Sequence, residues 1–403
     1  MTINGVFDIH SKTYSTLCYV SQDITNTNIN MNGTASIVAG DQVEIFSTGY
    51  SANIINSNIN ANGDYIASST GNVSPVYGFN FNSTLINSSV NINGLFTLSS
   101  DGQVFGVRLN NIDSTRININ GTFALFSSST SSGNFVRAVQ INGGNASSTV
   151  IINGTFAIES SCNAFGVDVP DSSAVNVLIG GVFSISSTSG VCAGVTFGGT
   201  YSGNSTISGV FNIASNSPSG SPAGVAFNAV ASGSTITITS IFTIYSLYTQ
   251  PRGVSIISTA GGNIDIGSIF TLSCVNGSQQ SYGLYLNSAT NNISFQTTNL
   301  FVLKGNNNCY SSNNDLGTQT NKMNVFGTTT NDSASAGTPD NYRTYTQDAN
   351  ISLIDQSHPV SSTVNFKMSY YSSLLSSDDT RSPMKTALQT YISQSYCPVV
   401  GKI

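Results

Sequence analysis

Charge is the property that this sequence has least of. Only 7% of its 403 residues are Asp, Glu, Lys or Arg, whereas about 25% is usual in a soluble domain. The formal net charge is −6, and no lysine occurs between Lys12 and Lys304. Because nucleic-acid binding depends on clustered basic side chains, the composition argues against a nucleic-acid partner.

Long apolar runs and residues that perform chemistry are also scarce. No stretch of about 18 apolar residues occurs, so we expect no membrane span. The two histidines, His10 and His358, lie in different regions, which makes a catalytic triad improbable. No motif for a nucleotide, zinc or calcium is present, so we expect no cofactor and no metal. The carboxylates and the arginine that a polysaccharide-cleaving solenoid would need are scattered: Asp113, Arg116, Asp168, Asp171 and Asp265. We therefore expect a protein without catalytic residues.

What the sequence has in abundance is repetition. A phrase such as Ile92-Asn93-Gly94-Leu95-Phe96 recurs in about eleven variants, and its aromatic mark returns from Phe7 to Phe301 at a mean of about 29 residues. Within one copy, apolar and polar residues alternate with the period of two that is typical of strands, and no helical spacing interrupts the array. Runs of Ser, Asn, Gly and Pro between the strands are turn sequences.

This pattern predicts an all-β parallel β-helix, or β-solenoid, of about eleven coils of roughly 29 residues. Because coils stack about 4.8 Å apart, equivalent side chains should lie over one another. We expect an amide ladder of Asn93, Asn120 and Asn153, limited to the N-terminal half because Gly and Ser replace Asn further on. We also expect an aromatic stack of Phe96, Phe123, Phe156, Phe183, Phe211, Phe242, Phe270 and Phe301.

The six cysteines lack the close spacing of a metal site. Cys162 and Cys192 are one repeat apart, which leaves two interpretations open. They form a disulfide across adjacent coils, or they are buried free thiols, since cysteine is among the residues most often buried.

The repeat divides the chain into three regions. Residues 1–303 form the solenoid, 304–355 an irregular linker or excursion rich in Asn, Ser and Thr, and 356–403 a C-terminal cap region. In the cap region, 364–370 alternates as one strand. A helix begins at Ser382-Pro383 and ends near Tyr396, with one apolar face. We expect the helix to cover the last coil.

The N-terminal end reads as a core strand without a cap, through Ile3, Val6, Phe7 and Ile9. Open strand edges are templates for pairing, and proteins normally cover them. Three explanations are open: truncation from a longer chain, a cap made by residues 14–20, or an end that receives another subunit. The third would produce a head-to-tail fibre of identical subunits.

The alternation with Asn-Gly bends, the low charge and the Ser/Thr/Asn surface resemble the passenger regions of bacterial β-helical surface proteins, of the autotransporter and filamentous-adhesin type. The resemblance covers residues 1 to about 303 and is one of architecture, because no family-specific motif is present. It implies a rod displayed on a surface that binds, spaces or assembles, and it implies no catalytic residues.

We therefore expect a non-catalytic extracellular structural protein, located at a cell or virion surface, that forms a homo-oligomer or a head-to-tail fibre. Met1 is followed directly by the first repeat, so a secretion signal has been removed or none is needed. The alternative is an adhesin or a phage or virus fibre component that binds glycans through turns and through Tyr201, Tyr245 and Tyr248. A glycan-cleaving enzyme and an ice-binding protein are weaker alternatives. For ice binding, the only regular threonine run is Thr235, Thr237 and Thr239.

Overall fold

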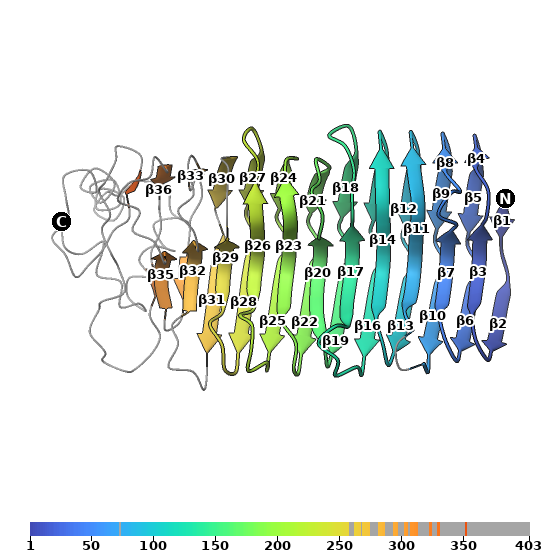
Figure 1. Ribbon diagram of the computed structural model, residues 1–403, viewed down its shortest axis with the longest axis horizontal. Coiled ribbons are helices and arrows are strands. Elements are labelled where there is room, and N and C mark those ends of the chain that lie inside the picture. The colour runs from blue at the N-terminus through green and yellow to red at the C-terminus, as the bar shows by residue number, and fades with distance from the viewer. Residues whose placement is uncertain are drawn as a thin grey trace, which may run out of the picture.

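The chain folds as a parallel β-solenoid, which confirms the predicted fold class (Figure 1). The computed structural model describes residues 1–71 and 74–257 and, beyond them, segments 262–266, 268–274, 281–286, 293–296, 302–304, 307–312, 322–324, 329–330 and 351–352. Strands, turns and bends make up this part of the chain, which contains no helix. Nine strands of one sheet fall within residues 1–257, so this stretch has about nine coils, against the eleven predicted for residues 1–303.

Each coil adds one main strand to each of three sheets. Sheet A contains β1 (Thr2–Ile3), β5 (Asn28–Met31), β9 (Asn58–Ala61), β12 (Ser89–Ile92), β15 (Arg116–Ile119), β18 (Thr149–Ile152), β21 (Asn176–Ile179), β24 (Ser205–Ile207), β27 (Thr235–Ile238), β30 (Gly262–Ile266), β33 (Ile293–Gln296), β36 (Lys322–Asn324) and β38 (Ile351–Ser352). Sheet B contains β2 (Val6–Ser11), β6 (Thr34–Ala39), β10 (Asp64–Ser69), β13 (Leu95–Ser100), β16 (Thr122–Ser127), β19 (Thr155–Ser160), β22 (Val182–Ser187), β25 (Val210–Ser215), β28 (Ile241–Ser246), β31 (Ile269–Cys274), β34 (Val302–Lys304) and β37 (Thr329–Thr330).

Sheet C contains β3 (Ser15–Val20), β7 (Val43–Thr48), β11 (Val76–Ile86), β14 (Val104–Asp113), β17 (Phe135–Ile141), β20 (Asn163–Val169), β23 (Cys192–Tyr201), β26 (Ala223–Val230), β29 (Arg252–Ile256), β32 (Ser281–Leu286) and β35 (Asn307–Ser312). Two short strands, β4 (Ile24–Thr25) and β8 (Ile54–Ile55), join this sheet beside the far end of β11. In all three sheets each strand pairs in parallel with its equivalents in the neighbouring coils, so the rod grows by one layer per coil (Figure 1).

The core contains a column of stacked aromatic rings on the inner face of sheet B. Phe96, Phe123, Phe156, Phe183, Phe211 and Phe242 follow one another with ring centroids 4.6 to 5.1 Å apart. Each of these side chains is at most 1% exposed. Tyr65 extends the column at the N-terminal side, with its ring centroid 5.4 Å from that of Phe96. The alternation read from the sequence therefore points these rings inward, where they bury a large apolar area.

The end of the predicted stack differs. Phe270 continues the backbone register from Phe242, but the residue opposite Phe270 in the next strand is Leu303. Leu303 stands 33 residues after Phe270, whereas Phe301 stands 31 after it, so the expectation that Phe301 continues the stack was out of register by two residues. Phe301 itself lies outside the described residues.

Three kinds of corner close each coil. Between sheets A and B the corner is a glycine in eight successive coils, Gly5 to Gly209. A Cβ added to Gly94 would lie 1.9 Å from the backbone oxygen of Gly63 in the coil before. Only a residue without a Cβ lets two backbones approach this closely. The glycine of the Asn-Gly phrase is therefore a requirement of stacking.

Between sheets C and A the chain turns at a single left-handed residue. Asn26, Asn56, Asn87 and Ser114 have φ of 53°, 50°, 46° and 50°. Asn adopts this conformation more readily than most residues do. A hydroxyl follows each of them, and its oxygen accepts the backbone N–H of the equivalent residue in the preceding coil: Thr27 to Ser57 at 3.0 Å, Ser57 to Ser88 at 3.1 Å, Ser88 to Thr115 at 3.2 Å and Thr115 to Ser148 at 3.3 Å.

Between sheets B and C, buried serines occupy the last position of each sheet B strand. Ser100, Ser127, Ser187 and Ser215 donate their hydroxyls to backbone oxygens of the coil before, at 2.6 to 3.3 Å. These bonds satisfy backbone groups that a sharp, buried corner would otherwise leave unpaired. Much of the Ser and Thr content is thus inside the corners of the rod.

The predicted regions beyond residue 303 are only partly described. Strands β35 to β38 fall within the predicted linker 304–355, and they pair in parallel with β32, β34, β33 and β36 of the solenoid. The rest of that linker and the predicted cap 356–403, with its strand 364–370 and its helix from Ser382 to Tyr396, lie outside the described residues. The domain boundaries therefore stay predictions.

The glycine corner generates a test of the fold. We expect Gly94→Ala to lower the free energy of unfolding by about 1–3 kcal/mol or more, because the new methyl group overlaps the backbone of the coil before. Urea denaturation followed by circular dichroism measures this. Gly133→Ala is the matched control, since the only atom near its added Cβ is a serine hydroxyl at 3.8 Å. Equal stability of the two variants would contradict the packing described for this corner.

Candidate functional site

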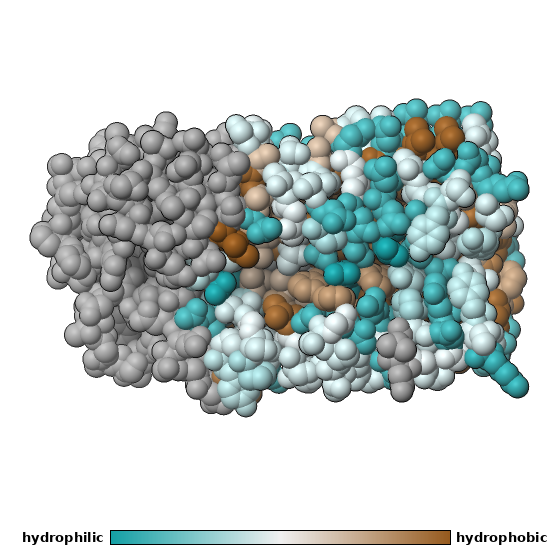
Figure 2. Space-filling model, in the orientation of Figure 1, coloured by the Kyte–Doolittle hydropathy of each residue, from teal (hydrophilic) through white to brown (hydrophobic). Residues whose placement is uncertain are grey.

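The three outer faces of the rod differ in chemistry, and each is a candidate site. Sheet A presents rows of asparagine, sheet B presents exposed residues of mixed type, and sheet C presents aromatic and charged residues that cover one another. On the long face shown in Figure 2, hydrophilic and neutral residues cover most of the surface and apolar residues appear in small separate patches. No single deep cleft dominates that face, so the candidate sites are extended surfaces.

Sheet A and its corner hold two parallel rows of asparagine amides. In the first row, each Nδ2 donates to the Oδ1 of the coil before, from Asn32 to Asn4 (3.3 Å), Asn62 to Asn32 (3.0 Å), Asn93 to Asn62 (2.9 Å) and Asn120 to Asn93 (3.1 Å). In the second row the bonds join Asn60 to Asn30, Asn91 to Asn60 and Asn118 to Asn91 at 2.7 to 2.9 Å. Such in-register amides resemble those of cross-β assemblies.

The predicted ladder of Asn93, Asn120 and Asn153 is correct for its first pair only. Within the described chain, no side-chain hydrogen bond joins Asn153 to Asn120. The Oδ1 of Asn153 instead lies 2.7 Å from where a Cβ on Gly180 would be, in the space that this glycine leaves open in the next coil. The second row ends at the same coil, because Asn118 lies opposite Ile151. The ladders thus occupy the N-terminal half.

Sheet C holds an ion pair that the sequence did not reveal. The Nε of Arg137 lies 2.7 Å from Oδ2 of Asp168, and the two side chains are only 14% and 8% exposed. Thr196, in the next coil, donates its hydroxyl to the same carboxylate. Burial raises the pKa of Asp168, although the Arg137 guanidinium opposes this shift. Burial likewise lowers the pKa of Arg137.

Aromatic rings enclose this pair. The guanidinium carbon of Arg137 lies 4.2 Å from the ring centroid of Phe135, and 5.7 and 5.8 Å from those of Phe105 and Phe165. Cations bind favourably over aromatic faces at these separations. The cluster is covered on its own face by neighbouring side chains, so it holds adjacent coils together and offers no open reactive group.

Nearer the N-terminus, Glu44 forms a second buried polar cluster on sheet C. Its carboxylate accepts hydrogen bonds from Tyr14 Oη (2.5 Å), Asn80 Nδ2 (2.7 Å) and Gln42 Nε2 (3.0 Å). Glu44 is 2% exposed. Burial and the bond to Glu44 raise the pKa of Tyr14 to about 12, so the tyrosine stays protonated and donates throughout the physiological range.

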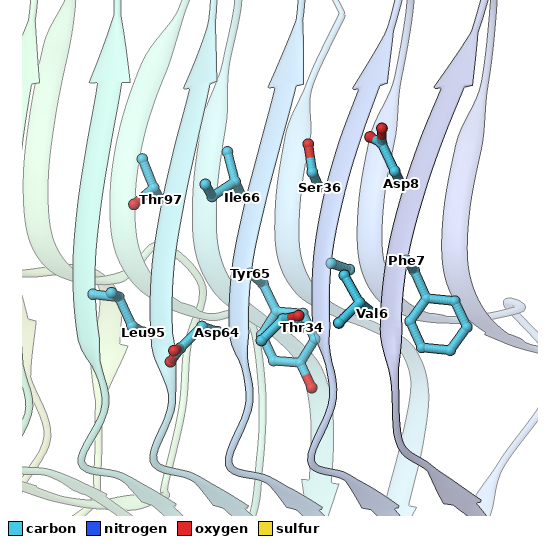
Figure 3. Close-up of a pocket in the computed structure, with 11 residues that line it drawn as sticks. Val6, Phe7, Asp8, Thr34, Ser36, Asp64, Tyr65, Ile66, Leu95 and Thr97 are labelled. Carbon is cyan, nitrogen blue, oxygen red and sulfur yellow. The ribbon is translucent and has the colours of Figure 1, made fainter.

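Sheet B has an open hollow of about 490 Å³ on its outer face, over the first four coils. Figure 3 shows its walls as two rows across the strands, Val6, Thr34, Asp64 and Leu95 in one row and Asp8, Ser36, Ile66 and Thr97 in the other. Its two carboxylates, Asp8 and Asp64, lie on strands separated by β6. Asp8 is paired at 3.2 Å with His10, which is two-thirds exposed. The hollow is lined by ordinary surface residues of a sheet.

The scattered acids of the sequence are placed in unrelated surroundings. Asp168 is in the Arg137 pair, and Asp113 accepts hydrogen bonds from Ser114 and Asn145 at the corner between sheets C and A. Arg116 begins β15 on sheet A and Asp265 lies in β30. Within the described ranges, no three His, Cys, Asp or Glu side chains are grouped as a metal site. No helix of the described part is long and apolar enough to cross a membrane.

The proposed bond between Cys162 and Cys192 is wrong. Both residues are free and buried, as is Cys18. The reason is register, because Cys192 lies opposite Ala164, two residues beyond Cys162. A separation of 30 residues in the sequence here exceeds the local coil length of 28 residues, which the pairing of Ala164 with Cys192 defines.

Two other predicted sets are changed by the structure. Tyr201, expected as an exposed aromatic, is 1% exposed, and its hydroxyl donates to the backbone oxygen of Val175 at 2.8 Å. Tyr248 is 45% exposed and Tyr245 is half-buried. Of the predicted assembly edge, Ile3, Phe7 and Ile9 are partly buried against the core, whereas Val6 is 86% exposed and projects from the outer face of sheet B.

Comparisons with protein-family models, with curated proteins and with solved structures find no match to this chain. The parallel β-solenoid architecture therefore rests on the coordinates and the repeat.

The Arg137 pair predicts a pH-dependent loss of stability. We expect Arg137→Leu to cost about 3–5 kcal/mol at neutral pH, because it leaves the Asp168 carboxylate buried without its cation. Without Arg137 the folded-state pKa of Asp168 rises further above its unfolded value. Protonated Asp168 is then tolerated, so the variant is more stable at low pH and loses stability as the pH rises through that pKa.

Urea denaturation at pH 4.5 and pH 7.5 measures this difference. The double variant Arg137→Leu with Asp168→Leu is the control, since it removes both charges and should recover most of the loss at neutral pH. A single variant as stable at pH 7.5 as at pH 4.5 would contradict the buried pair.

The cysteines give a separate test. Burial raises the pKa of Cys192 to about 12, and both Cys162 and Cys192 are at most 1% exposed. We expect neither to react with iodoacetamide in the folded protein, and both to react after unfolding without any reductant. Peptide mass spectrometry reads out the two sites. A requirement for reductant would show that the thiols are joined in a disulfide.

Proposed function

We propose that the protein is a non-catalytic extracellular structural rod that assembles end to end through its N-terminal coil. The observation that supports this proposal is the chemistry of that coil. Strands β1, β2 and β3 each stand first in their sheets and pair on one side only, with β5, β6 and β7. Three parallel edges thus present backbone donors and acceptors in one plane.

The same end presents part of the apolar core. Ile3, Phe7 and Ile9 are only partly buried, whereas the equivalent Phe96 is fully buried between neighbours. A further coil placed on this end would complete the backbone pairing of three sheets and bury these side chains at once. Exposed strand edges with an apolar surface are templates for strand addition.

The low charge and the resemblance to β-helical surface proteins support a location outside the cell or on a virion. Between Lys12 and the end of β29, the outward faces rely on Asn, Ser and Thr for hydration, a composition suited to a displayed rod. The rigid aromatic column and the corner hydrogen bonds suit a protein whose task is mechanical: it spaces or connects.

The test is assembly of the full chain. Negative-stain electron microscopy at increasing protein concentration should show rods that lengthen, and Phe7→Lys should abolish this growth by placing a charge in the contact. Val6→Lys is the matched control, because Val6 is next in sequence but projects sideways. Particles of one length at every concentration, or equal growth of both variants, would refute end-to-end assembly.

A second candidate, binding of glycans, is favoured by exposed tyrosines at the N-terminal end. Tyr14, Tyr19 and Tyr50 are 47%, 56% and 83% exposed, and Tyr19 belongs to the outer face of sheet C. Rings that offer an apolar face and a polar tip are suited to polar ligands with apolar patches. A glycan array with the wild-type chain and with Tyr19→Ala and Tyr50→Ala tests this, and absence of any tyrosine-dependent signal would exclude it.

A further inference from the structure

The outer face of sheet B is the most apolar exposed surface of the described rod. Alternate residues of every strand from β2 to β28 point outward, and most of them are exposed. Thirteen large apolar or aromatic residues are exposed in the described part of the chain, and six of them belong to this one face: Val6, Ile66, Leu95, Phe126, Val182 and Ile241, at 44% to 86% exposure.

Charge is almost absent from the same face. The six strands from β13 to β28 have three outward positions each, which makes eighteen, and Glu159 is the only charged residue among them. The others are Thr, Ser, Ala, Asn and apolar residues. Covering such a surface removes few charged groups from water, so the desolvation cost is low.

The size and period of the face fit a second copy. Nine strands about 4.8 Å apart and about 20 Å long give roughly 850 Å², close to the roughly 800 Å² that each partner contributes to a stable interface. A partner with rows at the same spacing can place its side chains between these rows along the whole face. A second copy of this chain has that spacing by construction.

We propose that the outer face of sheet B is a lateral docking surface for a second copy of this chain. Two rods then pack side by side with these faces together. The acidic residues Asp8 and Asp64 lie at the N-terminal end of the face (Figure 3). Parallel copies would bring the two acidic ends together, so the rods are antiparallel, with the uncharged strands β13 to β28 at the centre and the acidic strands toward the rim.

This contact is separate from end-to-end assembly, which uses the edges of β1, β2 and β3. A rod that pairs sideways and a rod that extends at its end therefore require different residues. The two proposals can fail independently.

Analytical ultracentrifugation of the full chain tests the lateral contact. We expect a concentration-dependent dimer, which Val182→Glu weakens at least about tenfold by placing a charge in the uncharged centre. Leu178→Glu is the matched control. Leu178 lies in the same coil and is 38% exposed against 44% for Val182, but it projects from sheet A. Dimerisation of this control should match that of the wild type.

Thermal unfolding of both variants keeps the test interpretable, since surface substitutions should leave the melting temperature nearly unchanged. If Val182→Glu melts early, Thr155→Glu on the neighbouring strand β19 replaces it. A wild type that stays monomeric, or equal weakening by Val182→Glu and Leu178→Glu, would overturn the proposal. Loss of dimers with continued growth of long rods in microscopy would support lateral docking and end-to-end assembly as two separate contacts.

A Thr243→Cys variant tests the orientation. Parallel rods would place equivalent sulfurs near each other at the C-terminal end of the face, whereas antiparallel rods keep them apart. Under mild oxidation we expect no more cross-linked dimer than the unmodified chain gives. Efficient cross-linking through residue 243 would overturn the antiparallel arrangement.

Discussion

Registration of equivalent residues in successive coils is the constraint on which the rest of the structure depends. In a parallel solenoid, a residue does not choose its neighbours freely, because the equivalent residue one coil away lies about 4.8 Å above it. Phenylalanine over phenylalanine gives a continuous ring stack, with centroids 4.6 to 5.1 Å apart from Phe96 to Phe242. Each aromatic pair contributes about 0.5–1.5 kcal/mol beyond its buried area. Stability therefore accumulates along the rod.

The same registration explains why the composition is so unusual. A charge repeated in every coil would place like charges one above another, which is unfavourable at this spacing. Neutral amides and hydroxyls instead gain from being repeated, since each donates to the copy below and accepts from the copy above. The asparagine rows of sheet A and the hydroxyl column from Thr27 to Ser148 are two forms of this solution. Arg137 and Asp168 are tolerated because adjacent coils hold opposite charges.

A long surface with three unlike faces suits structural and contact roles. Sheet C is covered by its own aromatic and charged residues, sheet A is hydrated through amides, and sheet B leaves a broad, nearly uncharged face exposed. End-to-end growth and lateral pairing would use different parts of this design, so a rod of this kind can extend in one direction and thicken in another. Both roles follow from geometry and surface chemistry.

The sequence by itself determined the fold class and the inward direction of the rings, because the period of two and the repeat of about 29 residues depend only on local backbone geometry. It also located the glycine that each corner needs. Only the tertiary structure decided which residues meet. Loop lengths vary between coils, so Cys192 lies over Ala164 and Leu303 lies over Phe270, each two residues away from the partner that counting suggested. The Arg137–Asp168 pair and the uncharged face of sheet B likewise appear only when the register of each strand is known.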